Sequence, residues 1–263
     1  GSPAAIHYTA EVMRRFFADR SQYLGDPDFV KLPLAGLLDP SYIRRRRASI
    51  DTNHATPSQQ LGPGKPAGSE GMETTHYSIV DAEGNAVAVT YTLNNGYGSG
   101  VTVPGLGFLL NDEMDDFTSK PGAPNLYGLL QSSANAIQPG KRPLSAMTPT
   151  IVLRDNKPYM VLGAPGGPRI VTSVLQTLLN VIDFRMNIQD AVDAPRFHHQ
   201  WMPDKLYLEQ GIAPATVTRL KALGHDVEYS PGVVLARVEA ILAEGGWLYG
   251  AADSRWIGKA AGY

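Results

Sequence analysis

The chain has 263 residues, a formal net charge of −2, 43% hydrophobic residues and 18% charged residues. This is the composition of a globular protein with a sizeable core, in one large domain or two small ones. The near-neutral charge excludes the broad basic field of a nucleic-acid binder. With no cysteine, disulfides, thiolate metal sites and cysteine nucleophiles are excluded. No apolar run reaches the roughly 18 residues that a transmembrane helix needs.

The N-terminal stretch predicts an amphipathic helix over residues 5–18. Tyr8, Val12 and Phe16 recur at a spacing of four, which predicts one apolar face packed against a core. The opening residues 1–3 carry neither a charged region nor an apolar region of the kind that marks a signal peptide, so none is visible.

A second, shorter helix is predicted over residues 41–50, with Ser41 as its N-cap. Its basic run, Arg44–Arg47, spreads around the helix, which favours a solvated surface over a binding patch. Residues 51–73 are rich in proline and glycine and predict a linker with little tendency to order. Such a linker suits a cleavable junction and equally suits a domain boundary.

A β-hairpin is predicted to follow, with strands at 76–80 and 86–94 around a short loop in which Gly84 supplies a positive φ. If the two ends of the loop pair with each other, a regular ladder places Thr74 opposite Thr92. A bulge at Gly84 would shift that pairing by one residue.

Thr74 and Thr75 permit two interpretations. They are ordinary strand formers at the start of a hairpin, or Thr74 is a nucleophile oriented by a facing hydroxyl. An alcohol is a weak nucleophile near neutral pH and needs a base. A threonine at a chain terminus has one in its own α-amine, whose reference pKa is about 7.7–8.0. The second interpretation therefore requires cleavage of the Glu73–Thr74 bond.

The middle of the chain alternates glycine-rich loops with a short predicted strand at 107–111. Residues 112–116 form an acidic cluster that favours an amine-binding site or a solvated loop, because the twelve-position calcium loop with its glycine is absent. Residues 121–140 are a long irregular loop containing Tyr127. Loops of this length in compact domains are usually functional, for example as lids.

Two strands, at 148–153 and 159–163, are predicted to lead into a helix at about 169–182. The intervening Gly166 and Gly167 allow two interpretations. A tight turn needs glycine, and a strand–turn–helix junction also aims free backbone N–H groups at one point, where they can hold an oxyanion.

The last third of the chain predicts further helices at 187–194 and 214–223, and a final hairpin at 238–251. Asn187 is expected to cap the first of these helices. His198 and His199 are adjacent in a strand and point to opposite faces, which favours structural histidines over a metal site.

Several of these stretches resemble the γ-glutamyltranspeptidase family, in the family's order and at its spacing. The matching motifs are Thr74–Ser78, Tyr91–Asn94, Met114–Phe117, Lys141–Ser145, Pro165–Gly167 and Ala194–Trp201, with Asp19–Ser21 and Tyr23–Phe29 as marks of the large subunit. The resemblance implies a domain division into 1–73, the C-terminal part of the large subunit with its linker, and 74–263, the small catalytic subunit.

The fold implied by this resemblance is α+β: the four-layer αββα sandwich of N-terminal-nucleophile hydrolases, here partial because most of the large subunit is missing. Members of the family cut themselves before the threonine into a heterodimer of two subunits. They transfer the γ-glutamyl group of glutathione and related amides to an amino acid or to water through an acyl-enzyme. The resemblance also implies a periplasmic or secreted protein, and neither a cofactor nor a metal.

Residue by residue, the resemblance implies Thr74 as nucleophile and base, with Thr92 bonding its hydroxyl. Gly166 and Gly167 would form the oxyanion hole. The donor would be held by Asn94, Glu113 and Asp116 at its α-amino group and by Ser145 at its α-carboxylate, with Tyr127 on a lid.

The sequence departs from the family pattern in two ways. The family usually has a second serine after Ser145, where this chain has Ala146. The family's arginine that pairs with the α-carboxylate has no match in residues 1–73. Three hypotheses therefore stay open: a γ-glutamyltransferase or hydrolase, a related acylase acting on another acyl group such as glutaryl, and an unprocessed, non-catalytic fragment.

Overall fold

The computed structural model describes residues 1–64, 76–229 and 231–262. They belong to two compact units, each built from separate stretches of the chain. Unit 1 comprises Gly1–Gly71, Glu113–Leu144 and Phe197–Val233, and unit 2 comprises Met72–Asp112, Ser145–Arg196 and Val234–Tyr263. These units are spatial clusters, so the division at residues 73 and 74, which concerns a cleavage point, stays a prediction.

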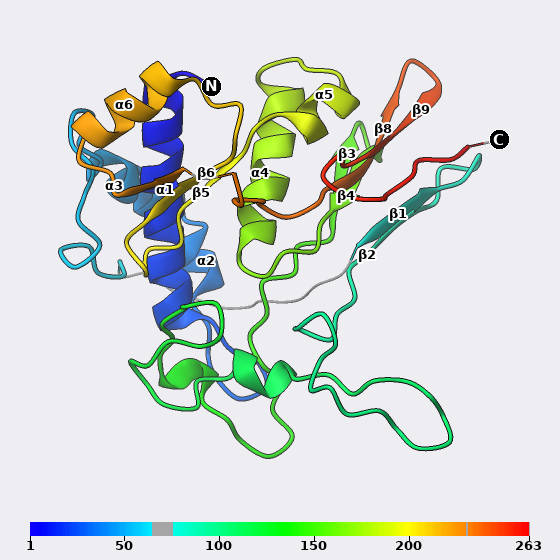
Figure 1. The fold of residues 1–263 in the computed structure, drawn as a ribbon, viewed down its shortest axis with the longest axis horizontal. Helices are drawn as coiled ribbons and strands as arrows, with labels where there is room; N and C mark the ends of the chain where they lie inside the picture. Colours follow the sequence, from blue (N-terminus) through cyan, green and yellow to red (C-terminus); the bar gives the residue numbers. More distant parts are fainter. Residues whose placement is uncertain (65–75, 230, 263) are drawn as a thin grey trace. The chain divides into compact units, whose positions relative to one another are not determined.

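Unit 2 contains an antiparallel sheet of four strands in the order β3-β4-β8-β9, a separate two-stranded hairpin β1-β2, and two helices (Figure 1). Its elements are β1 (Tyr77–Val80), β2 (Ala86–Val89), β3 (Thr150–Arg154), β4 (Lys157–Gly163), α4 (Arg169–Ile182), α5 (Ile188–Asp193), β8 (Glu239–Glu244) and β9 (Trp247–Ala252).

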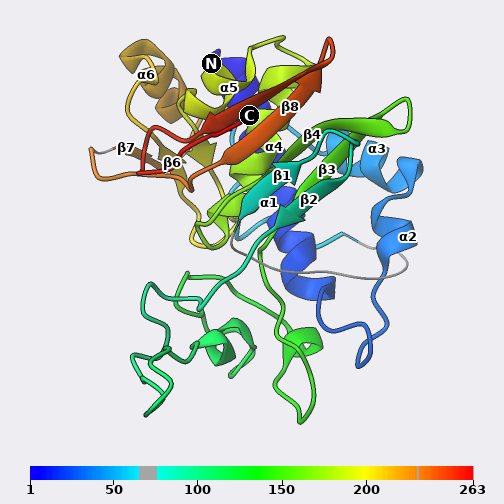
Figure 2. The same cartoon turned by 90° about the vertical axis from the view of Figure 1, so that its right-hand side faces the viewer.

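These elements of unit 2 form three layers (Figure 2). The β1-β2 hairpin covers one face of the four-stranded sheet, and α4 and α5 cover the other. The core between helices and sheet includes Met160 and Leu162 of β4 and Ile170 and Val174 of α4, all almost completely buried. Because β4 is buried on both faces, it reads as a continuous apolar run rather than an alternating one.

In unit 2, the helix bounds, the helix cap and the turn glycines agree with the sequence predictions. Helix α4 has the predicted bounds, and Asn187 caps α5 by accepting a hydrogen bond from the Asp190 backbone N–H at 2.9 Å. The turn of the last hairpin has positive φ at Gly245 and Gly246, the conformation that a two-residue hairpin loop requires.

Unit 1 is built on the long helix α1, with a small sheet of order β5-β6-β7. Strands β5 and β6 are antiparallel, while β6 and β7 are parallel and connected through α6. Its elements are α1 (Pro3–Tyr23), α2 (Leu34–Leu37), α3 (Pro40–Ala48), the 3₁₀ turns η1 (Glu113–Asp116) and η2 (Ser133–Asn135), β5 (Phe197–His198), β6 (Leu206–Leu208), α6 (Pro214–Ala222) and β7 (Val227–Tyr229).

The apolar core of unit 1 is small. Ile6 and Ala10 of α1 pack with Leu206 and Leu208 of β6 and Leu220 of α6. Around this core, unit 1 buries an unusual number of charged side chains: Glu11, Arg14, Arg15, Asp19, Arg20 and Asp26 are all less than 9% exposed.

Five local predictions are wrong, and one of them, the extent of the second hairpin strand, is described with the candidate site. Tyr8, Val12 and Phe16 are not on the buried face of α1 but are 43%, 48% and 40% exposed. Asp39, not Ser41, caps α3, because its carboxylate accepts from the backbone N–H groups of residues 41 and 42. The short strand predicted at 107–111 is only an isolated bridge between residues 102 and 109.

The fourth concerns residues 51–64, the described part of the predicted linker. They contain no helix or strand, yet Ser58 is 1% exposed and Leu61 is 8% exposed. Their backbone is fixed by side chains of other segments. Such contacts cannot be predicted from the proline and glycine content of a linker.

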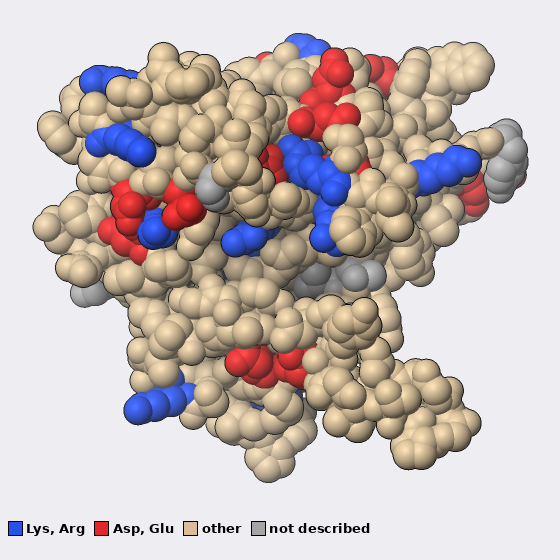
Figure 3. Space-filling view, viewed as in Figure 1, with Lys and Arg blue, Asp and Glu red and all other residues tan. Residues whose placement is uncertain are grey.

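On the face drawn in Figure 3, acidic and basic side chains occur in small mixed groups rather than in one field of a single sign. The basic run of α3 is largely solvated, since Arg44, Arg45 and Arg47 are exposed, as predicted. Arg46 instead reaches Asp19 at 2.7 Å. No helix among the described residues combines the length and apolar character that crossing a membrane requires.

Candidate active site

The β1-β2 hairpin has the register that the sequence predicts. Tyr77 pairs with Val89 without a bulge, and the Asp81 N–H donates to the Asn85 carbonyl at 3.1 Å. Glu73, Thr74 and Thr75 lie outside the described residues, so the pairing of Thr74 with Thr92 stays a prediction.

His76, the first described residue after the proposed cleavage point, is packed into the hairpin. Its Nδ1 lies 3.0 Å from Thr90 Oγ1 and its Nε2 lies 2.7 Å from Ser78 Oγ. A Cβ at Gly163 of β4 would lie only 2.2 Å from the His76 ring, so this position of the sheet must be glycine. Burial lowers the pKa of His76 to about 4, and the ring is therefore neutral near pH 7.

Sequence reasoning missed the importance of His76. His76 and Ser78 are two residues apart in a strand, so both lie on one face of it. Gly163, at the end of a buried strand, indicates a close approach of another group. Together these two features were the available signal.

Thr92 and Asn94 lie where the second strand of the hairpin gives way to the glycine-rich loop. The strand was predicted to reach residue 94 but ends at Val89. Thr92 Oγ1 accepts a hydrogen bond from the Asn94 backbone N–H at 2.8 Å, and Asn94 has a φ of 70°. Such local side-chain bonds compete with strand pairing. Because the Thr92 hydroxyl accepts here, its own proton can still be donated.

Asn94 is positioned further by Asp112. Asn94 Nδ2 lies 3.4 Å from the Asp112 carbonyl oxygen, and the next backbone N–H, of Asn95, donates to the Asp112 carboxylate at 3.0 Å. The side chain of Asn94 thus extends from a fixed turn.

The Gly166–Gly167 turn joins β4 to α4. Gly166 has a φ of 144° and Gly167 a φ of 59°, and a Cβ at Gly166 would lie 2.7 Å from the Ala236 side chain. Both the conformation and the close approach require glycine at 166. The carbonyls of the two glycines accept from the first N–H groups of α4, at 3.3 and 3.1 Å.

The amides of Gly166 and Gly167 donate to no acceptor within the described part of the chain. They lie at the N-terminal end of a 14-residue helix, where the helix dipole favours negative charge. The turn therefore satisfies both sequence interpretations, since it needs glycine and also leaves two adjacent donors available.

Ser145 and Ala146 belong to unit 2, where Ser145 is 5% exposed. Glu113 and Asp116 belong to unit 1, at the two ends of η1. The Asp116 carbonyl accepts from Asn135 Nδ2 at 2.6 Å, so the backbone of the acidic cluster is fixed. Both carboxylates are half-buried.

Tyr127 lies on the long irregular loop of unit 1. Its backbone N–H donates to the Asn125 side chain at 3.1 Å, and its carbonyl accepts from Gln200 Nε2 at 2.8 Å. The loop is therefore anchored at Tyr127. Sequence reasoning missed Gln200 because a single amide carries no pattern.

The histidine pair has structural partners. His198 Nε2 lies 2.9 Å from Gln200 Oε1, and His199 Nε2 lies 3.2 Å from Asp204 Oδ1. Burial lowers the pKa of His199. Over residues 1–64, 76–229 and 231–262, no three His, Asp or Glu side chains are grouped as a metal site.

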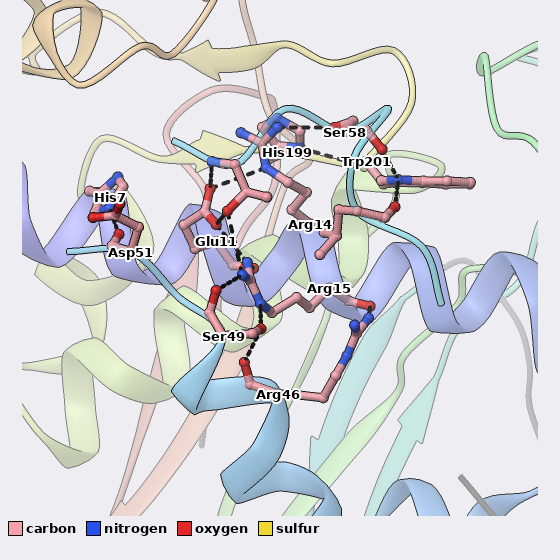
Figure 4. A network of polar contacts seen from close by, with 12 residues as sticks. His7, Glu11, Arg14, Arg15, Arg46, Ser49, Asp51, Ser58, His199 and Trp201 are labelled. Atoms are coloured by element: carbon pink, nitrogen blue, oxygen red, sulfur yellow. Dashed lines mark hydrogen bonds and ion pairs between the residues drawn. The ribbon is translucent and has the colours of Figure 1, made fainter. Parts of the chain in front are cut away.

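A polar network fixes the segment that precedes the proposed cleavage point (Figure 4). Thr56 donates to the Glu11 carboxylate through its N–H at 3.0 Å and its hydroxyl at 2.6 Å. The Ser58 N–H donates to Asp204 at 2.7 Å. The Trp201 indole N–H lies 3.0 and 2.9 Å from the carbonyls of Ser58 and Leu61. Residues upstream of position 73 are thus held by residues far downstream of it.

Asp204 is the ionised centre of this network. Burial opposes its charge, but hydrogen bonds from His199 and Ser58 and the positive charge of Arg14 hold its pKa well below the usual range. Arg14 pairs with Asp204 directly and donates to Ser58 Oγ at 3.0 Å.

Unit 2 combines a hairpin, a four-stranded sheet and a helical layer with a glycine turn at the N-terminus of α4. This arrangement is that of an N-terminal-nucleophile hydrolase fold of α+β class. Known structures agree. A chain of cephalosporin acylase from Bacillus halodurans matches all of this chain with a TM-score of 0.86 and 26% identity, and this chain covers 46% of it.

The chain belongs to the γ-glutamyltranspeptidase family, whose model, described as "Gamma-glutamyltranspeptidase", matches residues 1–263. It is 49% identical over 264 residues to the glutathione hydrolase proenzyme of Escherichia coli, covering 100% of this chain and 45% of that protein. A γ-glutamyltranspeptidase chain from Pseudomonas nitroreducens, solved with L-DON, has a TM-score of 0.69 and 50% identity. It matches 72% of this chain and 100% of its own length. The chain thus spans about half the length of the E. coli relative. The predicted family and partial αββα fold are confirmed.

Proposed function

We propose that this chain carries the catalytic half of a γ-glutamyltransferase or glutathione hydrolase that is activated by self-cleavage between Glu73 and Thr74. The observation that carries the proposal is the Gly166–Gly167 turn, whose two amides are not used as donors within the described residues. Two such donors match the requirement of an acyl-transfer oxyanion hole.

The proposed reaction uses Thr74 twice. Its released α-amine accepts the hydroxyl proton as Oγ attacks the γ-carbonyl carbon of the donor, and the carbonyl oxygen becomes an oxyanion bonded by the two glycine amides. Collapse of this intermediate breaks the C–N bond, and the ammonium returns its proton to the leaving amine. Water or an amino-acid amine then attacks the acyl-Thr74 ester and releases the γ-glutamyl product. Thr92, whose proton is free to donate, orients Thr74 Oγ.

The proposed contacts pair each charged group of the donor with protein groups of opposite charge or matching hydrogen-bonding capacity. The α-ammonium group of a γ-glutamyl donor is matched by the Glu113 and Asp116 carboxylates and the Asn94 side-chain oxygen. The hydroxyl of Ser145 donates to the α-carboxylate. Tyr127, anchored through its backbone, is the proposed lid residue. The remaining contacts are supplied by polypeptide equivalent to the part of the relatives that this chain does not match.

The proposed products of cleavage are a 73-residue piece and a piece of 263 − 73 = 190 residues. The second is 190/263, or 72%, of this chain. The same 72% is matched by the whole P. nitroreducens chain, which supports a separate chain of that size. We propose a heterodimer made from one precursor, in the periplasm or secreted; cell fractionation tests that location.

Two observations favour a second candidate, an acylase for glutaryl-type amides. Ala146 stands where the family usually has a second serine, which removes one donor for the α-carboxylate. The B. halodurans cephalosporin acylase also matches the whole chain. A substrate without the α-amino and α-carboxylate groups would not need these contacts.

Denaturing electrophoresis tests the main proposal. The protein is expected to give pieces of about 73 and 190 residues, and Thr74→Ala should leave one uncut chain. Thr75→Ala, which changes the neighbouring threonine, is the matched control and should still be cut. Cleavage that persists in the Thr74→Ala variant would refute the assignment of the nucleophile.

An assay of the processed enzyme with γ-glutamyl and glutaryl anilides separates the two candidates. Faster turnover of the γ-glutamyl compound supports the first, and faster turnover of the glutaryl compound replaces it with the second.

A further inference from the structure

Residues 234–238, the stretch that leads into β8, lie against the Gly166–Gly167 turn within unit 2. Ala236 is 5% exposed, and a Cβ built on Gly166 would lie 2.7 Å from the Ala236 Cβ and 2.8 Å from its Cα. The two residues are therefore in direct contact. Ala236 occupies the side of Gly166 on which any other residue would carry its side chain.

Ala236 has an unusual backbone conformation. Its φ is 59°, in the left-handed region that is unfavourable for an L residue with a Cβ and that glycine adopts readily. A residue of this kind persists only where its surroundings hold it, and such residues cluster at functional sites. An alanine at this position therefore indicates that its methyl group has a use.

Side chains from two other segments hold this stretch in place. The Leu235 carbonyl accepts from Ser173 Oγ and from Arg196 Nη1, both at 3.1 Å. Arg169 Nη1 donates to the Val234 carbonyl at 3.1 Å. Arg169 and Ser173 belong to α4, so the stretch is bonded to the helix at whose N-terminus the glycine turn lies.

The direction of each turn amide is set through the carbonyl of its own peptide group. A trans peptide is planar, so its N–H and C=O point in opposite directions. The Arg237 N–H donates to the Pro165 carbonyl at 3.2 Å, which fixes the plane that contains the Gly166 N–H. The Arg169 N–H donates to the Gly166 carbonyl at 3.3 Å, in the plane that contains the Gly167 N–H. The first donor follows Ala236 directly, so the conformation of Ala236 determines where it points.

We propose that Ala236 is a positioning residue for the proposed oxyanion hole. Its methyl group and left-handed backbone hold the Gly166–Gly167 turn in the conformation that leaves both amides available. Two consecutive glycines have wide conformational freedom, and within the turn and α4 one bond of 3.3 Å restrains the peptide between them. Ala236 supplies, from a distant part of the chain, the restriction that the glycines lack.

The catalytic consequence of this restriction rests on the proposed function. An oxyanion hole lowers the barrier because its donors are oriented before the reaction begins. The restriction of the turn itself can be measured without any activity, and the experiment uses both measurements.

The sequence allows the turn to be observed directly by NMR. Gly166–Gly167 and Gly245–Gly246 are the two pairs of consecutive glycines in the chain. Glycine labelled with ¹³C at the carbonyl and ¹⁵N at the amide therefore selects the amides of Gly167 and Gly246. Gly246 lies in the last hairpin turn and is an internal control. Relaxation is recorded on the Thr74→Ala chain, so that the result does not depend on self-cleavage.

Ala236→Gly removes the methyl group and suits a positive φ, so the chain is expected to fold. In this variant the order parameter of the Gly167 amide should fall from about 0.85 to below about 0.6, the value of a flexible backbone. Gly246 should not change. Ala236→Ser keeps the Cβ and is the matched control, with both amides unchanged. An unaltered order parameter of Gly167 in Ala236→Gly would overturn the proposal.

The second measurement is turnover of a γ-glutamyl anilide by the processed enzyme. Ala236→Gly should lower kcat by about 10- to 100-fold with KM unchanged, because misplaced donors weaken transition-state stabilisation rather than substrate binding. Ala243→Gly makes the same substitution near the other end of β8 and should keep kcat, as should Ala236→Ser. If Ala236→Gly and Ala243→Gly lowered stability alike and left kcat unchanged, the role of Ala236 would be structural only and the proposal would be overturned.

Failure of the proposed function has a different signature. In that case the parent enzyme turns over neither anilide, while the Gly167 amide still loses order in Ala236→Gly. The two failures are therefore distinguishable.

Discussion

Unit 1 and unit 2 bury different kinds of side chain. In unit 2, Met160 and Leu162 of β4 pack against Ile170 and Val174 of α4, and apolar side chains fill the space between layers. In unit 1, buried positions of α1 hold charges such as Glu11, whose oxygens have particular partners. Apolar layers tolerate exchange of similar side chains. A buried polar network does not, because each lost partner leaves another group unsatisfied.

The largest expected effect on activity concerns the Gly166–Gly167 turn, where β4 of unit 2 is joined to α4. Gly166→Ala should lower kcat of the processed enzyme by roughly 100-fold or more, the usual consequence of losing an oxyanion-hole donor. The added Cβ would collide with Ala236 and move the amide. Turnover of a γ-glutamyl anilide measures the effect.

Gly232→Ala is the matched control, because a Cβ there meets nothing within 4 Å. If Gly166→Ala kept activity within about threefold of the parent, far from the usual 100-fold loss, the amide pair would have no catalytic role.

A second effect, on stability rather than on activity, tests the buried charges of unit 1. Glu11→Ala should lower the free energy of unfolding by about 3–5 kcal/mol, the range for breaking a buried ion pair. Arg14 and Arg15 lose their shared carboxylate, and Thr56 loses its acceptor. Denaturant titration gives the value.

The control for this measurement is Glu228→Ala, which removes the partly exposed partner of Lys205 and should cost less than about 1 kcal/mol. Equal losses for the two variants would mean that the network of unit 1 is no more stabilising than a surface pair.

The smallest effect is a pH dependence that arises in unit 1. Burial, reinforced by the charge of Arg14, lowers the pKa of His225 from 6.5 to about 3. Between these two pKa values the unfolded chain binds a proton at His225 that the folded chain does not bind. The free energy of unfolding therefore decreases as pH falls from 6.5 towards 3. The slope is roughly 1.4 kcal/mol per pH unit for one such proton.

His225→Asn should remove that contribution and flatten the decline between pH 6.5 and 5. His54→Asn, at an exposed position, should leave the slope unchanged. Unfolding curves at several pH values give both slopes. An unaltered slope in His225→Asn would assign the acid sensitivity to other groups.

The same contrast explains which elements could be predicted from the sequence. Helix α4 and the last hairpin are defined by local signals, namely apolar periodicity and turn glycines, that act within a few residues. The two unpredicted strands β6 and β7 have three residues each, too few for a period to show. Of the candidate site, the Gly166–Gly167 turn could be predicted because a strand–turn–helix junction is local.

The misplaced face of α1 has a different cause. The spacing of Tyr8, Val12 and Phe16 predicts an apolar stripe, but a period does not say which neighbour covers it. Thr56, which donates to Glu11, and Ser58, which donates to Asp204, each lie more than 40 residues from that partner in the chain, and no spacing rule connects such residues. Thr74 lies outside the described residues, so its role as the nucleophile stays a prediction.

The construction of unit 1 from stretches on both sides of residue 73 changes what denaturation means for this molecule. An uncut chain recovers unit 1 by an intramolecular search, whose rate is independent of concentration. If the bond before Thr74 is cut as proposed, the upstream stretch with α1 and the downstream stretch with β6 become separate molecules that must first meet. Maturation would then convert a first-order refolding reaction into a second-order one, and a diluted enzyme that unfolds would have little chance of return.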